Sequence, residues 1–310
     1  MVASAAMTTD DRSVGAGDEL CAWFEDLRIS DVARVGGKNA SLGEMLSQLA
    51  SAGIPVPPGF ATTAAAYWAF LDHNELRPFL TAALAALKAG AQTLAATGEA
   101  IRRRVRAAEL PPALARAIVA SYRALAAREG REHVSVAVRS SATAEDLPEA
   151  SFAGQQETYL NIDGEAALLE ACRACYASLF TDRAIAYRDV HGFDHMKVAL
   201  SIGVQRMVRS DRGSAGVMFT IDTETGFPEA VMINAAWGLG ENVVQGAVNP
   251  DEFVVFRPLL EAARPILRKR LGSKEKTMIF ARGAGRTTRN VDTPAARRER
   301  FALDDDDVLT

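Results

Sequence analysis

A lysine that follows two glycines is the first feature of this sequence that could bind an anion. Glycines let the backbone approach a phosphate closely, and the ammonium group of Lys38, directly after Gly36 and Gly37, would add a positive charge. The segment is not a Walker A loop, because Asn39 follows the lysine where that motif has Ser or Thr. A solvated lysine in a tight turn is the alternative explanation when this motif is taken alone.

A second candidate for anion binding is an arginine followed by hydroxyl side chains. Arg139 precedes Ser140, Ser141 and Thr143, and it lies where the alternating valines of 134–138 predict the end of a strand. Ligands often contact mixed α/β proteins at the ends of strands. A guanidinium can also hold a phosphate through two hydrogen bonds at once. The alternative is a capped turn in which the arginine forms a structural ion pair.

A strand followed by a helix is expected to position the lysine. The segment from Cys21 to Val35 is strand-like, and apolar residues from Leu42 to Leu49 fall at helical spacing until Gly53 ends the pattern. The sequence therefore predicts that Lys38 lies at a strand-to-helix turn.

Helices and two further strands are expected to surround the arginine. The prolines of 54–60 predict an extended segment, and the alanine-rich stretch from there to Arg128 predicts helices. Another strand is expected at about Glu157 to Ile162, followed by helices across Glu165 to Arg188.

The remainder of the sequence is rich in predicted strands. They are expected at Lys197 to Val208, Gly216 to Ile221, Glu229 to Asn234, Glu252 to Arg257, Thr277 to Ala281 and Thr287 to Val291. We therefore predict a tail over 1–19, a helix-rich subdomain over 20–203 and a sheet-rich subdomain over 204–310. The acidic run from Asp304 to Thr310 is typical of the first turn of a helix, which predicts a chain truncated at its C-terminus.

Composition excludes several classes of partner. The net charge of −4 lacks the positive surface that nucleic acid binding needs. No run reaches about 18 apolar residues, and the first 19 residues lack the apolar core of a signal peptide. We therefore expect neither a nucleic acid nor a membrane as partner, and a cytoplasmic location.

Cysteines, histidines and a further glycine pair offer weaker chemical signals. Cys172 and Cys175 could form a redox couple or half of a zinc site, but no second ligand pair follows, so we expect structural thiols on the buried face of a helix. Gly238 and Gly240 do not begin a dinucleotide motif, because Val243 stands at its third glycine. The four histidines are scattered, and none of them suggests a catalytic triad.

Three longer motifs resemble the nucleotide-binding domain of the phosphoenolpyruvate-utilising dikinase family. They span Val35 to Met45, Val138 to Asn161, and Gly238 to Gly246 together with Asn249 to Glu252. The resemblance extends over nearly all of the sequence from Leu20 to Thr310. Within the family, the first and last of these motifs are more similar to phosphoenolpyruvate synthases than to rifampicin phosphotransferases.

The resemblance implies an α+β fold of the ATP-grasp type, in which two subdomains hold ATP in the cleft between them. It assigns Lys38 and Arg139 to the phosphates of ATP and to catalysis, Gly154 and Thr158 to a lid over the phosphates, and Gln205, Arg206, Met207 and Val208 to a hinge at the adenine base. The lysine and arginine would act by positioning and by neutralising charge on the transferred group.

The resemblance also implies an activity for the full-length enzyme, a phosphotransferase of gluconeogenesis with two acceptors. ATP would give a pyrophosphoryl group to a histidine on a separate domain, leaving AMP. Water would then remove the outer phosphate, and pyruvate would accept the remaining phosphoryl group to give phosphoenolpyruvate. Those partner domains are absent from the 310 residues, and the ligands of Mg²⁺ are expected beyond Thr310, so this fragment alone is expected to be inactive. The alternatives are the ATP-binding domain of a rifampicin phosphotransferase and a catalytically incomplete nucleotide-binding module.

Overall fold

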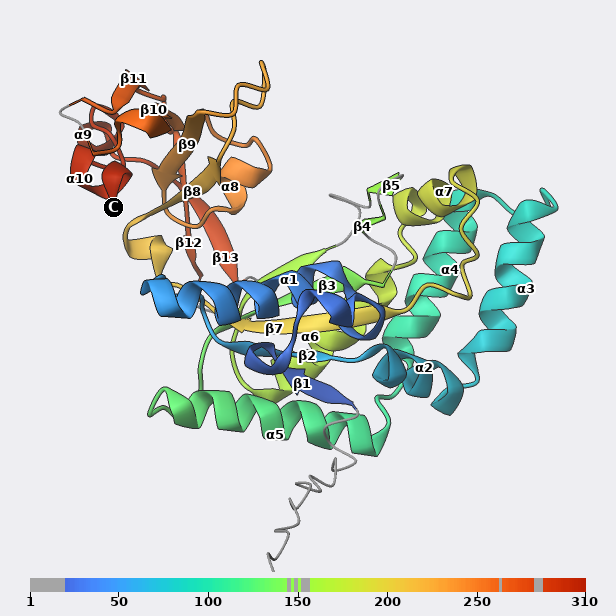
Figure 1. The fold of residues 1–310 in the computed structure, drawn as a ribbon. Coiled ribbons are helices and arrows are strands. Elements are labelled where there is room, and N and C mark those ends of the chain that lie inside the picture. Colours follow the sequence, from blue (N-terminus) through green and yellow to red (C-terminus); the bar gives the residue numbers. More distant parts are fainter. Residues whose placement is uncertain (1–19, 144–145, 148–149, 152–156, 262–263, 282–286) are drawn as a thin grey trace, which may run out of the picture. The chain divides into compact units, whose positions relative to one another are not determined.

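The chain forms two compact units, which we describe separately (Figure 1). The computed structural model describes residues 20–143, 146–147, 150–151, 157–261, 264–281 and 287–310. Unit 1 ends at Met207, and unit 2 runs from Val208 to Thr310. The boundary expected at residue 203 lies inside strand β7, Leu200–Arg206, whose last residue still pairs with Val136 in the sheet of unit 1.

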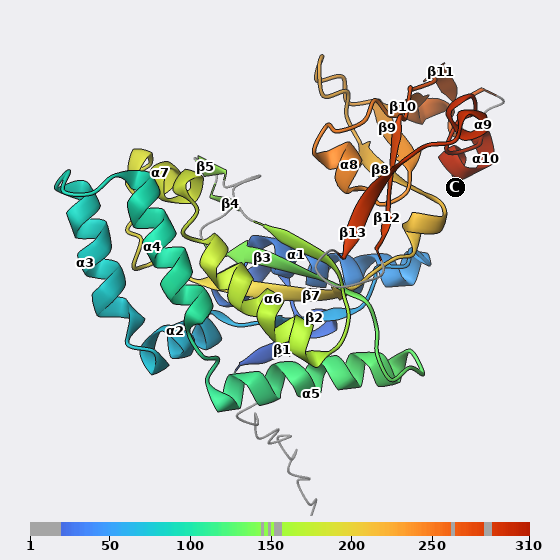
Figure 2. The ribbon, with the colours of Figure 1, turned by 180° about the vertical axis from the view of Figure 1, so that it is seen from behind.

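An antiparallel sheet of five strands forms the centre of unit 1 (Figures 1 and 2). Its order is β1 (Cys21–Trp23), β2 (Gly59–Thr62), β7 (Leu200–Arg206), β3 (Val136–Ala142) and β6 (Thr158–Ile162). Strand β7 comes last in the sequence and lies in the middle of the sheet, where it pairs with both β2 and β3. A short two-stranded pair, β4 (Asp146–Leu147) and β5 (Ala150–Ser151), is separate from this sheet.

Helices pack on both faces of this sheet. The helices of unit 1 are α1 (Val32–Leu49), α2 (Ala64–His73), α3 (Leu76–Lys88), α4 (Leu94–Ala107), α5 (Pro112–Arg128), α6 (Glu165–Ser178) and α7 (Asp182–Val190). Of these, α3 and α7 pack on α4. Threonines cap three of them, because the side chains of Thr63, Thr93 and Thr181 accept the N–H of a residue in the first turn of α2, α4 and α7. Helices α1 and α6 cover opposite faces, as the two views show.

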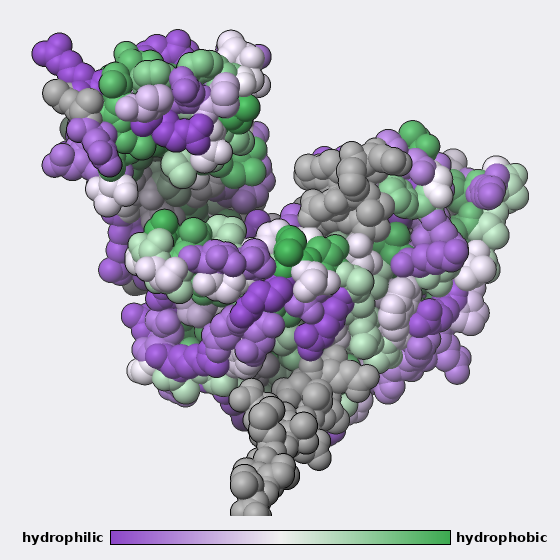
Figure 3. All heavy atoms as spheres, in the orientation of Figure 1, coloured by the Kyte–Doolittle hydropathy of each residue, from purple (hydrophilic) through white to green (hydrophobic). Residues whose placement is uncertain are grey.

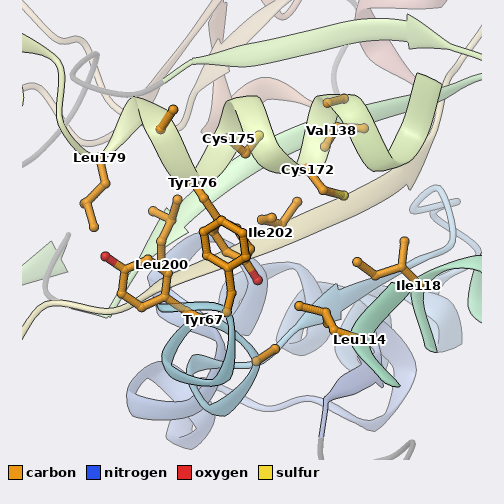
Figure 4. Packing of buried hydrophobic residues seen from close by; sticks show 14 of the residues in the cluster. Tyr67, Leu114, Ile118, Val138, Cys172, Cys175, Tyr176, Leu179, Leu200 and Ile202 are labelled. Carbon is orange, nitrogen blue, oxygen red and sulfur yellow. The ribbon is translucent and has the colours of Figure 1, made fainter. Parts of the chain in front are cut away.

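The main core of unit 1 lies between the sheet and α2, α4, α5 and α6 (Figure 4). Tyr67 and Tyr176 meet there with ring centroids 5.4 Å apart, and Phe70 stacks on Tyr176 at 4.9 Å. Cys172 and Cys175 are fully buried on the inward face of α6, which confirms that they pack as core residues. Burial raises the pKa of both thiols, so neither is poised as a thiolate nucleophile.

The region before Lys38 differs from the expected strand. Only Cys21–Trp23 forms a strand in this segment, and short 3₁₀ turns over Phe24–Asp26 and Ile29–Asp31 follow it before α1. Helix α1 already begins at Val32 and is interrupted at Gly36, whose φ of 74° and ψ of 162° are not helical. The prediction of a strand-to-helix turn was therefore wrong, and Lys38 lies instead in the first turn after a break within a helix.

Unit 2 is built mainly from strands, as its sequence predicts. Its four-stranded sheet has the order β11 (Ile266–Arg270), β10 (Asp251–Phe256), β9 (Ala230–Trp237) and β8 (Ser214–Phe219), and β12 (Lys276–Phe280) pairs with β13 (Thr288–Asp292). Short helices follow at α8 (Glu241–Val244), α9 (Ala295–Arg298) and α10 (Asp305–Leu309), with 3₁₀ turns at Ser210–Arg212 and Arg257–Leu259. The helical turn expected after Asp304 is confirmed, because Asp304 and Asp307 form a capping box at the start of α10.

The last residues of the chain cover one face of the four-stranded sheet. Phe253 and Val255 of β10 are buried against Phe301 and Ala302. Apolar side chains also reach the surface of this unit, among them Met218, which is 63% exposed on the edge strand β8. Figure 3 shows such apolar residues interspersed with polar ones.

A buried ion pair attaches the same terminal segment to the sheet. One oxygen of the fully buried Asp251 carboxylate accepts from the Gly272 N–H (2.8 Å) and from Lys274 Nζ, and the other accepts from the Ala302 N–H (2.7 Å). Lys274 is also fully buried, and its Nζ donates a further bond to the Gly272 carbonyl oxygen at 2.9 Å.

Both units thus combine antiparallel sheets with helices, which confirms the α+β class. Within the described residues, no helix is long and apolar enough to cross a bilayer.

Candidate anion-binding site

Gly36 creates the break that shapes the start of the site. A Cβ atom at this position would lie 2.3 Å from Ser141 Oγ and 2.4 Å from the Ser141 carbonyl oxygen, so no larger residue fits. Its positive φ is also a conformation that residues with a Cβ rarely adopt. The close approach places the resumed helix, beginning at Gly37, directly against strand β3.

Lys38 bonds to the backbone of β3 just beyond its pairing with β6. Strand β6 pairs with β3 only as far as the Arg139–Thr158 pair, whereas β7 continues along β3 to Ala142. Beyond the end of β6, Lys38 Nζ donates to the Ser140 carbonyl oxygen at 3.5 Å, and the lysine side chain is half-buried. The ammonium charge therefore lies at the point where the sheet loses a strand.

Arg139 and Thr158 lie on the same face of the sheet as α1. They are directly opposite each other in the β3–β6 register, and both are half-buried. Successive side chains of a strand alternate between faces, so Arg139 shares its face with Ser141, whose hydroxyl contacts α1. The expectation that Arg139 lies at the end of a strand was wrong, because β3 continues for three residues to Ala142. The arginine and the threonine hydroxyl lie on one face of the sheet, and Lys38 bonds to the residue that follows Arg139.

The predicted hinge residues lie elsewhere on the sheet. Arg139 pairs with Gly203 of β7, and Arg206 follows Gly203 by three residues, or about 10 Å along the strand. The side chain of Gln205 donates to the Pro57 carbonyl oxygen at 3.0 Å, and Arg206 forms a 3.0 Å ion pair with Glu129.

The backbone of the predicted hinge is partly occupied by bonds within the protein. The N–H of Arg206 donates to the Pro58 carbonyl oxygen and that of Met207 to the Ser135 carbonyl oxygen, both at 2.9 Å. Val208, the first residue of unit 2, is 56% exposed. A base bound here would therefore pair beyond Met207 or displace one of these bonds.

The described residues test neither the second lid residue nor the ligands of Mg²⁺, which are expected beyond Thr310. Gly154, the other expected lid residue, lies outside the described residues. Among the residues that are described, no group of three or more His, Cys, Asp or Glu side chains could hold a metal ion. We therefore assign no ligand of Mg²⁺ within this part of the chain.

Sequence reasoning missed one buried polar residue beside the lysine. Asn39 is only 2% exposed and bonds to both α1 and the sheet. It entered the sequence analysis only as a mismatch to the Walker A motif. A glycine within the β7 pattern, Gly203, was the available signal, because it marks a place where another group closely approaches the strand.

Comparison with known proteins places the chain in a family. The family model described as "Pyruvate phosphate dikinase, AMP/ATP-binding domain" matches residues 32–310. The chain is 55% identical over 295 residues to the phosphoenolpyruvate synthase of Neisseria meningitidis, covering 94% of this chain and 37% of that protein. It is also 58% identical over 289 residues to the phosphoenolpyruvate synthase of Pseudomonas aeruginosa, covering 92% of this chain and 36% of that protein.

A third relative gives the same result. The phosphoenolpyruvate synthase of Escherichia coli is 51% identical over 293 residues, covering 93% of this chain and 37% of that protein. The chain thus spans a little over a third of the length of these relatives. Because the family model matches almost the whole described chain, the resemblance inferred from the three motifs is confirmed, and this chain belongs to the pyruvate phosphate dikinase AMP/ATP-binding domain family.

Proposed function

We propose that this chain is the ATP-binding domain of a phosphoenolpyruvate synthase and that Lys38, Arg139 and Thr158 bind the phosphates of ATP. The observation that carries the proposal is that Lys38 bonds to Ser140, the residue that follows Arg139 on β3, in a chain of this ATP-binding family. Two cations from elements about 100 residues apart in sequence suit a polyanion better than a neutral ligand.

Each side chain has a distinct role in this proposal. Lys38 supplies a compact positive charge in the first turn of a helix, where the backbone dipole also favours anions. Arg139 supplies a planar fork that can donate two hydrogen bonds to one phosphate. The Thr158 hydroxyl adds a neutral donor opposite the arginine. Together they hold and neutralise the phosphates while one of them is transferred, which is the main task in phosphoryl transfer.

The adenine base and the lid belong to the same proposal. We assign the base to the segment Gln205, Arg206, Met207 and Val208, where an apolar methionine side chain and backbone polar groups follow the central strand. Gly154 is proposed as a lid residue near Thr158. An ATP-grasp fold, which the resemblance implies, is part of the same proposal.

The activity of the whole enzyme is proposed from its relatives. Proteins named phosphoenolpyruvate synthase are more than 50% identical to this chain and contain it as about a third of their length. A full-length enzyme of this kind would phosphorylate pyruvate with ATP and water in the cytoplasm, through a histidine on another domain. Mg²⁺ would assist charge neutralisation there, and we assign no step to it in this chain.

Nucleotide titration of this chain tests the phosphate site. Calorimetry with ATP, AMP and adenosine should show the tightest binding for ATP. Lys38→Ala and Arg139→Ala should each weaken ATP binding about 10- to 100-fold, which corresponds to a lost charge-assisted bond of about 1.5–3 kcal/mol, and should leave adenosine binding nearly unchanged.

Matched variants control for the loss of charge alone. Lys88→Ala at the end of α3 and Arg116→Ala in α5 remove the same charges elsewhere in unit 1. Equal losses for ATP and adenosine in the Lys38 and Arg139 variants would contradict the proposed phosphate contacts. Failure of the unmodified chain to bind ATP would contradict the proposal that these 310 residues hold the site.

A further inference from the structure

We infer that Asn39 is the positioning residue of this phosphate site, because its buried side-chain amide fixes the helical turn that carries Lys38 against strands β3 and β7. The inference rests on the proposed function, since it gives Asn39 a role toward ATP without contact to it. The observation behind it is a buried polar network that joins α1 to three strands of the sheet.

The first contacts of Asn39 are made within α1 and with β3. Its Nδ2 donates to the Val35 carbonyl oxygen at 3.1 Å, which spans the break at Gly36. Its backbone N–H donates to Ser141 Oγ at 3.3 Å. The residues before and after the break are thereby tied to each other and to β3, with Lys38 between them.

The same amide group is also bonded to β7. Nδ2 donates its second hydrogen to Ser201 Oγ at 2.8 Å, and the Ser201 hydroxyl in turn donates to the Thr62 carbonyl oxygen of β2. Because the single hydroxyl hydrogen of Ser201 is used for Thr62, its oxygen must accept from Asn39. This fixes the amide orientation, since the reverse orientation would place Oδ1 against two groups that need a donor.

Gly203 provides the space that this arrangement needs. A Cβ atom at position 203 would lie 2.3 Å from Asn39 Oδ1. The same glycine pairs with Arg139 across β7 and β3. Asn39 therefore lies between the backbone that carries Lys38 and the strand position opposite Arg139, so a shift of its amide changes the relative placement of the two cations.

A purely structural asparagine and a positioning asparagine predict different results. Loss of a structural residue lowers the melting temperature but leaves the nucleotide preference of the folded protein unchanged. Loss of a positioning residue moves the Lys38 ammonium relative to Arg139, so it weakens binding of the phosphates and spares the nucleoside. The ratio of ATP affinity to adenosine affinity separates the two roles.

The experiment measures this ratio for variants of the full 310-residue chain, at a temperature where each variant is folded. Asn39→Ala should lower ATP affinity about tenfold and change adenosine affinity less than twofold. Asn39→Asp keeps the size of the side chain, but its ionised carboxylate cannot donate a hydrogen bond. Its ATP affinity, relative to the unmodified chain at the same pH, should recover as the pH is lowered from 8 to 6, because burial at this position favours the protonated carboxyl, which regains one donor.

Further variants serve as a milder test and as a control. Ser201→Ala removes one acceptor of Asn39 without touching α1, and it should lower the ratio by a smaller factor. Gln48→Ala changes an exposed amide of the same helix, whose Nε2 bonds only to Glu44 among the described contacts, and should leave the ratio unchanged.

The measurements distinguish a failure of the Asn39 inference from a failure of the proposed phosphate site. If the unmodified chain prefers ATP and Lys38→Ala abolishes that preference, the phosphate site stands. An unchanged ratio in Asn39→Ala, or in Ser201→Ala and Asn39→Asp if the alanine variant does not fold, would then overturn the inference, even if the melting temperatures fall.

Discussion

Unit 1 attaches helix α1 to its sheet through neutral side chains, whereas unit 2 attaches the segment after β13 through a buried charge. In unit 1, the neutral side chains of Asn39, Ser141 and Ser201 bind α1 to the strands. In unit 2, the buried carboxylate of Asp251 binds the segment after β13, and the buried ammonium of Lys274 neutralises that carboxylate. Removing one member of a buried ion pair leaves a charge without compensation, whereas removing one hydroxyl leaves the rest of a neutral network in place. The ionic attachment should therefore fail abruptly and the neutral one by degrees.

The largest expected effect is the loss of the buried lysine. Lys274→Met should lower the free energy of unfolding of unit 2 by about 3–5 kcal/mol, because the Asp251 carboxylate is then buried without its cation. Hydrogen exchange of the amides of β9 and β10 in the whole chain measures this. Lys276→Met is the matched control, since Lys276 pairs with Asp292 at the surface.

A second variant tests whether the charge itself is the cause. Asp251→Asn combined with Lys274→Met removes both charges, so its loss should be smaller than that of Lys274→Met alone. If the double variant lost as much stability as Asp251→Asn and Lys274→Met together, packing and not charge would hold this segment.

An intermediate effect is expected for the neutral network. Ser201→Ala should lower the free energy of unfolding of unit 1 by about 1–3 kcal/mol, since Asn39 and Thr62 each lose one partner. Urea denaturation measures the change, with Ser51→Ala as control because the Ser51 hydroxyl lies at the surface. A loss as large as that of Lys274→Met would remove the distinction between the two attachments.

The stability of unit 1 is expected to depend on pH through His195, which contacts the buried charge of Arg188. The Nε of the fully buried Arg188 donates to His195 Nδ1 at 2.7 Å, so His195 Nε2 carries the hydrogen that faces Asp189, 2.8 Å away. Burial, and then the Arg188 charge, hold the pKa of His195 below its usual range, although the carboxylates of Asp189 and Asp194 oppose the shift. The neutral imidazole is therefore the form that the folded state favours.

The sign of the pH dependence follows from this lowered pKa. The unfolded chain takes up a proton at His195 first, so the contribution to stability is complete above the ordinary histidine pKa of about 6.5 and is lost as the pH falls through that value. Urea denaturation of unit 1 between pH 7.5 and 5.5 should show a steeper loss for the unmodified chain than for His195→Asn. His73→Asn, at the exposed end of α2, should keep the steep dependence.

The smallest effect is expected for a surface ion pair of unit 1. Arg123 and Glu165 are 2.6 Å apart, but the arginine side chain is 68% exposed. Arg123→Ala should change the free energy of unfolding by at most about 1 kcal/mol, and 0.5 M salt should reduce the difference further. A larger, salt-independent loss would mean that exposure is a poor guide to which charges matter in this chain.

Local signals in the sequence were sufficient for most elements of the fold. Proline at the start of α5 and glycine after its end, together with alternating valines in β3, place these elements without any knowledge of their partners. Strand β11 was missed because Arg268, Lys269 and Arg270 hide its pattern; two of them pair with Glu252 across the strands.

The sequence could predict which residue types form the candidate site, but it could not predict how the fold arranges them. The charges of Lys38 and Arg139 identified them as phosphate ligands, but the sequence placed Lys38 after a strand that does not form. The role of Asn39 depends on the pairing of β3 with β7, which are separated by about 60 residues. Gly203 signals that some group closely approaches β7, but no local pattern identifies Asn39 as that group, so only the structure reveals the contact.

The position of β7 has a consequence for how the protein is made. Strands β2 and β3 emerge from the ribosome well before β7, yet each of them pairs with β7 and they do not pair with each other. The sheet of unit 1 therefore stays incomplete until about residue 206 has been synthesised. During translation, the β1–β2 and β3–β6 pairs must wait for the strand that joins them. In this interval their unpaired edges expose the nascent chain to aggregation and make it dependent on chaperones.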